Sequence, residues 1–241
     1  FLRMQIKVAK KLNSVIVVSK SSKQDIHDDF GLKKEAMKVI LNGIDTEAFF
    51  PDENIKKIPF RIVTSASADV PLKGLDYLLE AFSEVIKIFP DSTLQIIGSS
   101  KQGGHTSRKI NDLNIKEKVQ FNNDLSFKEV RDLYCSADVV VIPSLYEGFG
   151  FAIGEAMACR VPVITTSGGA IPEVIEDCGI LVSPGNSKEL EEAMLKLLPD
   201  DEKKSFFAEK GFNRIIEHLK WEKVAKLMTE SYETEINRIT N

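Results

Sequence analysis

The stretch of sequence that decides the fold runs from Ser136 to Thr166 and reads SADVVVIPSLYEGFGFAIGEAMACRVPVITT. It opens with an apolar, β-branched run, Val139–Pro143, and closes with a second one, Val161–Thr165. Between them lie a Pro-Ser loop, a turn marked by glycines and a run that reads as a helix. This order is typical of an α/β protein with parallel strands. Ligands of such proteins bind at the carboxyl ends of the strands, where the glycine turn lies.

The same alternation continues on both sides of this stretch. Short apolar runs that are polar only at their ends indicate strands buried between two helical layers. The other predicted strands are Ser14–Ser19, Arg61–Ser65, Thr93–Ile97, Val119–Asn122 and Ile180–Ser183. Apolar residues at helical spacing predict the helices Gly74–Phe89, Ser126–Cys135, Ser187–Leu198, Asp200–Leu219 and Trp221–Ile239. The polar stretch Ser99–Ser107 predicts a loop.

Composition narrows the class of protein. The chain has 241 residues and a net charge of −4, from 32 Lys and Arg against 36 Asp and Glu. This balance argues against nucleic acid as the main partner, because proteins that bind the phosphate backbone carry a basic excess. No apolar run is long enough to span a bilayer. The three cysteines and three histidines lie far apart, with no CxxC, so neither a disulfide framework nor a metal site is predicted.

The first fifty residues read as a separate piece. The chain opens at Phe1 without a signal-peptide pattern, which suggests part of a longer protein. Asn-Gly and Pro-Asp pairs place a boundary near Asn42–Pro51. A single strand and helix before that boundary cannot bury their own apolar faces. We therefore expect this leading segment to need a partner.

The glycine turn has the features of an anion site. Gly148 and Gly150 allow a ligand close to the backbone, and the amides of Phe149, Gly150 and Phe151 would point out of a helix N-terminus. The helix dipole alone favours a phosphate there by about 0.3–1 kcal/mol. A dinucleotide fingerprint is the alternative, but the spacing is GxGxxxG, and Ile153 stands where that fingerprint requires glycine.

Two carboxylates flank the turn, Glu147 just before the helix and Glu155 inside it, with seven residues between them. Both can face one crevice. Spacing alone leaves the opposite interpretation open, in which Glu147 is a loop carboxylate near a helix N-terminus and Glu155 a solvated helix residue.

The whole segment resembles the signature of the retaining glycosyltransferases of GT-B fold usually called family 4, PSxxEGFGxxxxEAMAxxxPVI. The matching positions are Pro143, Ser144, Glu147, Gly148, Phe149, Gly150, Glu155, Ala156, Met157, Ala158, Pro162, Val163 and Ile164. Further motifs of that family are similar to Asn42–Asp45 (NGxD), Pro71–Gly74 (a KG turn), Ser167–Glu173 (GGxxE), Gly179–Gly185 (GxLV.PG) and Trp221.

This resemblance implies an α/β, Rossmann-like parallel sheet sandwiched by helices, the C-terminal half of a GT-B glycosyltransferase. Residues 1–50 would be the tail of the N-terminal acceptor domain and the interdomain linker. Residues 51–241 would be the C-terminal nucleotide-sugar-binding domain, with the closing helix 221–239 packing back toward the N-terminal half. The implied activity is retaining transfer of a sugar from a nucleoside diphosphate to a glycan, lipid-linked or small-molecule acceptor, as in polysaccharide biosynthesis. Without its acceptor domain the chain is expected to be inactive in transfer.

The resemblance also assigns roles to residues. Lys73 would stabilise the departing diphosphate, and Glu147 would contact the donor sugar and place negative charge near its developing positive centre. Glu155 would accept hydrogen bonds from the ribose hydroxyls. The remaining donor-binding residues implied are Gly148, Phe149, Gly150, Phe151, Ser67 and Asn123. No cofactor or metal is implied, and the UDP- or GDP-linked sugar is a substrate. The expected location is the cytoplasm, with the missing half able to meet the membrane face.

The sequence departs from the family pattern at two places. Ser67 stands where relatives commonly carry an Arg, so one positive charge is missing or comes from Lys101, Arg108 or an absent domain. Arg160 replaces a Gly after the signature helix, where a left-handed residue would cost about 1 kcal/mol. Because of Ser67, a non-catalytic nucleotide-sugar-binding or regulatory subunit is the alternative function. A dinucleotide-dependent oxidoreductase is discouraged by Ile153.

Overall fold

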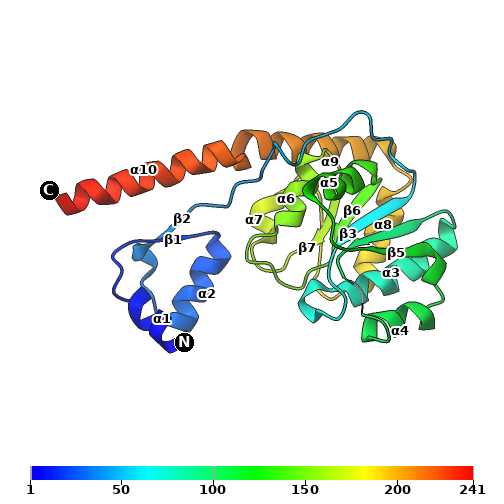
Figure 1. Ribbon diagram of the computed structural model, residues 1–241, viewed down its shortest axis with the longest axis horizontal. Helices are drawn as coiled ribbons and strands as arrows, with labels where there is room; N and C mark the ends of the chain where they lie inside the picture. The colour runs from blue at the N-terminus through cyan, green and yellow to red at the C-terminus, as the bar shows by residue number, and fades with distance from the viewer. Residues whose placement is uncertain (1, 100, 241) are drawn as a thin grey trace.

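The structure is a computed structural model that describes residues 2–99 and 101–240. Phe1 and Ser100, which lies in the predicted loop Ser99–Ser107, fall outside the described residues. The larger sheet is wholly parallel, with strand order β5-β4-β3-β6-β7-β8 (Figure 1). Its strands are β3 (Arg61–Ser65), β4 (Thr93–Ile97), β5 (Val119–Asn122), β6 (Val139–Ile142), β7 (Val163–Thr166) and β8 (Ile180–Val182). A second sheet contains only β1 (Val15–Val17) and β2 (Met37–Val39).

Helices cover both faces of the larger sheet (Figure 1). The α-helices are α1 (Leu2–Ala9), α2 (Lys20–Phe30), α3 (Leu75–Ile88), α4 (His105–Asp112), α5 (Phe127–Ser136), α6 (Phe151–Ala158), α7 (Ile171–Ile175), α8 (Ser187–Leu197), α9 (Asp201–Arg214) and α10 (Trp221–Thr240). Strand β6 shows why the apolar runs are continuous. Val140 and Ile142 pack with α5 and α6, whereas Val139 and Val141 pack with α3 and α8. Both faces of the strand are buried, and the α/β, Rossmann-like fold is confirmed.

The structure differs from the prediction at several elements, of which three are instructive. β2 was missed, because its three residues, MKV, are too short to show a period; β1 pairs with it in parallel. Helix α4 begins inside the predicted loop, at His105, and its first turn is capped from a distance by Asp69, whose carboxylate accepts from the Thr106 amide at 2.9 Å. The predicted helix Asp200–Leu219 is α9 followed by a π-helical turn, Ile215–Leu219.

Residues 2–39, the leading unit, form a small body beside the larger one (Figure 1). Its buried apolar cluster consists of Val17, Leu32 and Met37. The segment that follows the leading unit contacts the start of α10. Ile44 forms an isolated parallel β-bridge with Lys220, and a Cβ on Gly43 would lie only 2.7 Å from the Trp221 Cα. The far end of α10 returns over the leading unit, where the two line a hollow of about 470 Å³.

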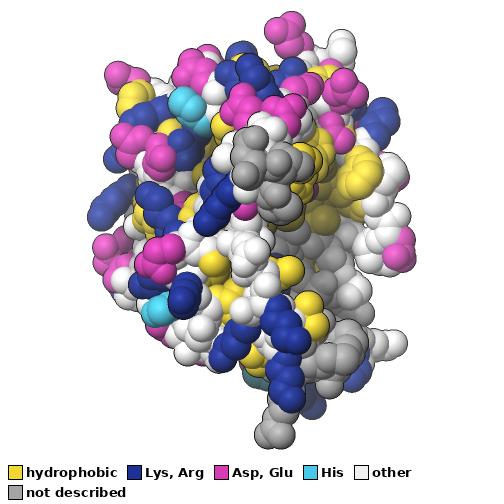
Figure 2. Space-filling view, turned by 90° about the vertical axis from the view of Figure 1, so that its left-hand side faces the viewer, with side chains coloured by type: hydrophobic (Ala, Val, Ile, Leu, Met, Phe, Trp, Pro, Cys, Tyr) yellow, Lys and Arg dark blue, Asp and Glu magenta, His cyan; other side chains and the backbone are white. Residues whose placement is uncertain are grey.

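The charge of the leading unit is uneven. Figure 2 shows Lys and Arg side chains gathered on the lower part of the face that this unit presents. Among the described side chains of the leading unit, the exposed basic ones are Lys7, Lys10, Lys11, Lys20, Lys33 and Lys38. Within the described ranges, no helix combines the length and the apolar character that crossing a bilayer requires.

Candidate functional site

The turn after β3 is fixed to the loop after β6. Pro71–Lys73 form a short 3-10 turn that ends at Gly74, whose φ is +64°. A Cβ on Gly74 would lie 2.0 Å from the Pro143 carbonyl oxygen, so only glycine allows the two backbones to approach this closely. The Leu145 amide also donates to the Leu72 carbonyl at 2.8 Å. Lys73 is therefore held beside the loop that carries Glu147.

Lys73 and Glu147 form an ion pair at this junction. Lys73 Nζ lies 2.7 Å from Glu147 Oε1, and the Ser144 hydroxyl donates to the same oxygen at 2.7 Å. The Glu147 side chain is 18% exposed and that of Lys73 is 39% exposed, so both remain accessible to a ligand. Ser144 is fully buried, and its carbonyl accepts the Thr166 hydroxyl of β7. Two strands thus fix the orientation of the Glu147 carboxylate.

The loop continues directly into the start of α6. Gly150, with φ +97°, is the N-cap and provides no side chain to satisfy the first amides of the helix. The Phe149 ring is buried and meets the half-exposed Phe151 ring edge-on, with 5.0 Å between centroids. Gly148 is exposed, and a Cβ there would meet nothing within 4 Å. The helix start is open to an anion on the Gly148 side.

Glu155 lies further along α6, against α5. Burial raises its pKa to about 7, and the nearby Tyr134 hydroxyl offsets part of that rise. Tyr134 is fully buried, and burial together with the Glu155 charge raises its own pKa well above the usual value. Its hydroxyl makes no hydrogen bond of ordinary geometry with the described residues. Glu155 is thus not the freely solvated helix residue that spacing alone allowed.

Two of the residues predicted to bind the donor lie apart from this pair. Ser67 is exposed in the loop after β3, and Asn123 is exposed after the edge strand β5, where its amide donates to Asp124 at 2.6 Å. Both follow the carboxyl ends of strands, the same edge as Glu147, but neither contacts the Lys73–Glu147 pair in the hydrogen bonds of the described residues. Ser67 is neutral, so it does not supply the positive charge of the Arg expected there.

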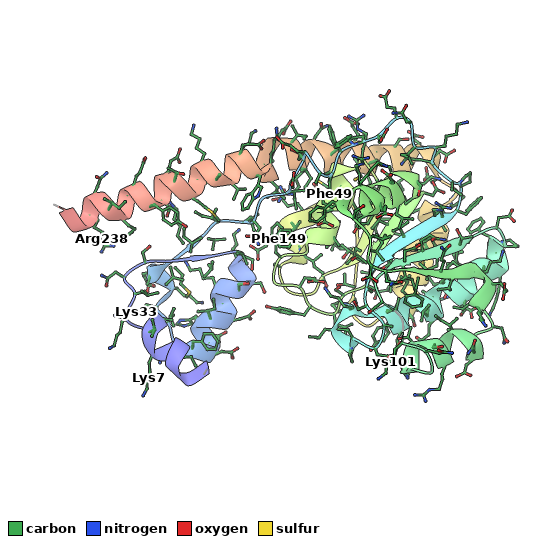
Figure 3. The ribbon with its side chains drawn as sticks, viewed as in Figure 1. Lys7, Lys33, Phe49, Lys101, Phe149 and Arg238 are labelled. Carbon is green, nitrogen blue, oxygen red and sulfur yellow. The ribbon has the colours of Figure 1, made fainter. Side chains whose placement is uncertain are left out.

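The basic residues suggested as replacements for that Arg lie elsewhere. Lys101 and Arg108 line a hollow of about 550 Å³ beside α4 and β5. Figure 3 places Lys101 on that side of the larger body, away from Phe149, which faces the leading unit. A further cavity of about 390 Å³, between α3 and α4, reaches Leu145 but none of the predicted site residues.

Several site groups were not predicted. Ser144 and Thr166 orient Glu147. Of the two, Ser144 stands in the quoted signature, which is the sequence signal that could have indicated it. Tyr134 lies against Glu155 through tertiary packing, which no local pattern shows. Glu173, within the GGxxE motif, binds backbone amides of the leading unit. Among the described residues, no group of three or more His, Cys, Asp or Glu side chains is arranged to hold a metal ion.

The chain is similar to known proteins over most of its length. Residues 59–200 match the family model described as glycosyl transferases group 1. The chain is 36% identical to the MMP alpha-(1->4)-mannosyltransferase of Mycolicibacterium hassiacum over 242 residues, which covers 99% of this chain and 58% of that protein. The chain therefore spans somewhat more than half the length of this relative.

Solved structures show the same fold. Sucrose-phosphate synthase from Thermosynechococcus elongatus superposes with a TM-score of 0.84 at 24% identity, over 98% of this chain and 62% of that one. HepE from Anabaena, in complex with UDP-glucose, superposes with a TM-score of 0.86 at 23% identity, over 97% of this chain and 67% of that one.

Proposed function

Since the chain belongs to the glycosyl transferases group 1, we propose that it is the donor-binding part of a retaining, family 4 glycosyltransferase, which moves a sugar from a nucleoside diphosphate to an acceptor. The observation that carries the proposal is the Lys73–Glu147–Ser144 cluster beside the open start of α6. It combines a cation, a fixed carboxylate and free helix amides at the carboxyl edge of a parallel sheet.

The diphosphate is assigned to Lys73 and the first amides of α6. In the transfer, the bond between the sugar C1 and the β-phosphate oxygen breaks, and negative charge develops on the departing diphosphate. An ammonium group and preorganised amides stabilise that charge, whereas water would have to reorient around it. Lys73 would exchange its contact with Glu147 for the phosphate. No metal is assigned to this step.

Glu147 is assigned to the sugar. Its carboxylate would hold the donor hydroxyls and stabilise the positive charge that develops at C1 as the bond breaks. Ser144 would keep the carboxylate oriented once Lys73 turns to the phosphate. The acceptor oxygen then bonds to C1 on the face the diphosphate leaves, and the acceptor proton passes to the leaving phosphate. This order accounts for retention without a protein nucleophile.

Glu155 is assigned to the ribose hydroxyls, which an ionised carboxylate accepts well. The base would lie toward Asn123, and both UDP and GDP remain candidates. The similarity to a mannosyltransferase makes a mannosyl donor the first to test, and the UDP-glucose complex of HepE makes a glucosyl donor the second.

The rest of the enzyme is also part of the proposal. Residues 1–50 are assigned to the end of an acceptor domain and the interdomain linker, and residues 51–241 to the donor domain. The chain alone would then bind the donor without transferring its sugar. The cytoplasmic location stays a prediction. Ser67, which leaves one phosphate charge unsupplied, favours a non-catalytic nucleotide-sugar-binding subunit as the second candidate.

A calorimetric titration with UDP, GDP and ADP tests the assignment. We expect micromolar binding of UDP or GDP and at least tenfold weaker binding to Glu155→Ala. The matched control is Glu202→Gln, which changes an exposed carboxylate on α9. No binding of any nucleotide, or equal binding by Glu155→Ala, would count against the proposal.

A further inference from the structure

The leading unit touches the loop that carries Glu147 on both sides of that residue. The Tyr146 hydroxyl donates to Asp25 of α2. The Gly148 carbonyl accepts the hydroxyl of Ser19 at 3.2 Å, and Ser19 is fully buried as the N-cap of α2. The two chain neighbours of Glu147 are therefore bound to one helix of the other unit.

Helix α2 is itself held by a carboxylate of the larger body. Glu173 accepts the Lys20 amide on Oε2 at 2.7 Å and the Ser21 amide on Oε1 at 2.9 Å. These are the first two amides of α2, which have no acceptor within the helix, and a negative charge is favoured at that end. Hydrogen bonds to a charged acceptor are also stronger than neutral ones.

Glu173 sits on a rigid support. Arg214 of α9 is 9% exposed, and it donates to the Glu173 carbonyl at 2.6 Å and to the Val174 carbonyl at 2.6 Å. At the other end of the same segment, the Ala170 amide donates to the Glu147 carbonyl at 2.8 Å. The segment that carries Glu173 therefore also braces the backbone of Glu147.

We propose that α2 is a positioning element for Glu147 and that Glu173 is the latch that holds α2 against the Glu147 loop. The inference rests on the proposed transfer for its effect on rate, but not for the latch itself. With the latch closed, Tyr146 and Gly148 are fixed and Glu147 has one orientation. With the latch open, the amides of Lys20 and Ser21 are solvated and the loop loses its support from the leading unit.

Two variants break the same contact from opposite sides. Glu173→Gln removes the charge and turns one acceptor into a donor. Lys20→Pro removes one donor amide while keeping α2, because proline fits the first helical position and Ser19 before it is extended, with φ −164° and ψ 161°. Glu202→Gln, at an exposed position of α9, is the matched control.

Pulsed electron-spin distances in the full-length protein report the latch directly. Labels at Lys33→Cys and Lys203→Cys occupy exposed positions on the two units, and Cys135, Cys159 and Cys178 are buried. We expect one narrow distance distribution for the control. Glu173→Gln and Lys20→Pro should each lower the closed-to-open ratio about tenfold, and the double variant by less than the product of the two effects, because both act on the hydrogen bonds of one carboxylate. Distributions equal to the control, or additive effects, would overturn the latch.

Kinetics separate positioning from packing. Neither variant touches the residues assigned to the diphosphate and the ribose, so the dissociation constant for UDP or GDP, which lack the sugar that Glu147 would hold, should stay within twofold while kcat falls about tenfold. A shifted distance distribution with unchanged kcat would overturn the positioning role. Failure of every nucleotide sugar to bind would refute the proposed function instead, and the distance measurement would still decide the latch.

Discussion

Binding of the donor should depend on pH through Glu155. Burial raises the pKa of this carboxylate to about 7, so lowering the pH below 7 protonates it. Ribose hydroxyls donate to the ionised form, so binding requires the proton to leave. With a pKa of about 7, the ionised fraction rises about tenfold between pH 6 and pH 8. The apparent dissociation constant should fall by the same factor, about tenfold.

Calorimetry with an intact nucleotide sugar measures this effect. Each of its two phosphates has one ester bond and shares the anhydride bond, so neither titrates in this range, unlike the terminal phosphate of UDP or GDP. Repeating the titration at pH 6.5 in buffers of different ionisation enthalpy should reveal release of a proton on binding. Glu155→Gln should bind more weakly with no pH dependence. An affinity that is flat from pH 6 to pH 8 in the unaltered chain, or no proton release, would refute the assignment of Glu155 to the ribose.

Three further predictions concern stability and charge. Because the pKa of Glu155 is raised above its unfolded value of 4.5, its ionisation destabilises the fold as pH rises from about 4.5 to 7. Glu155→Gln should therefore raise the free energy of unfolding at pH 8 by about 3 kcal/mol in urea melts. An unchanged or lower free energy of unfolding would contradict the buried environment of Glu155. Gly74→Ala should lower the free energy of unfolding by about 2–4 kcal/mol, because the new Cβ would clash with the Pro143 carbonyl. Gly103→Ala, at a similar φ of +70° with open space around it, should lower it by about 1 kcal/mol. Equal melting temperatures of the two variants would exclude the close approach of the Gly74 and Pro143 backbones. Lys73→Met should weaken binding of UDP or GDP by about 10–100-fold and reduce its salt dependence, whereas the exposed Lys188→Met should change neither, and an unaffected titration would remove Lys73 from the diphosphate site.

The sheet could be predicted because its signal is local. The four residues of β6 are all buried, and each neighbouring strand is likewise a short apolar run bounded by polar residues. Helix periodicity was as clear for α3, whose buried residues recur every three or four positions. Arg160 after α6 does have the predicted left-handed backbone, with φ +56°.

The elements that were missed depend on contacts between distant segments. β2 exists as a strand because β1 lies beside it, and α4 begins at His105 because Asp69, thirty-six positions earlier, caps it. No short window of sequence contains both partners of either contact.

Within the site, the motif indicated Lys73 and Glu147, and the structure brings their side chains together. It could not show that the two pair directly, since their separation depends on how the β3 and β6 loops meet at Gly74. The raised pKa of Glu155 and the hydrogen bonds of Glu173 to α2 were equally hidden, because burial and contacts between distant segments follow only from the packed structure.

In the proposed function, the Lys73–Glu147 cluster acts in the transfer of a sugar from a nucleotide. The most direct measurement is a transfer assay with the full-length protein and labelled GDP-mannose or UDP-glucose, with the anomeric configuration of the product read by NMR. We predict a product of retained configuration, formed at least 100-fold more slowly by Glu147→Ala and at the normal rate by Glu202→Gln. Transfer that survives Glu147→Ala undiminished, or a product of inverted configuration, would contradict the account.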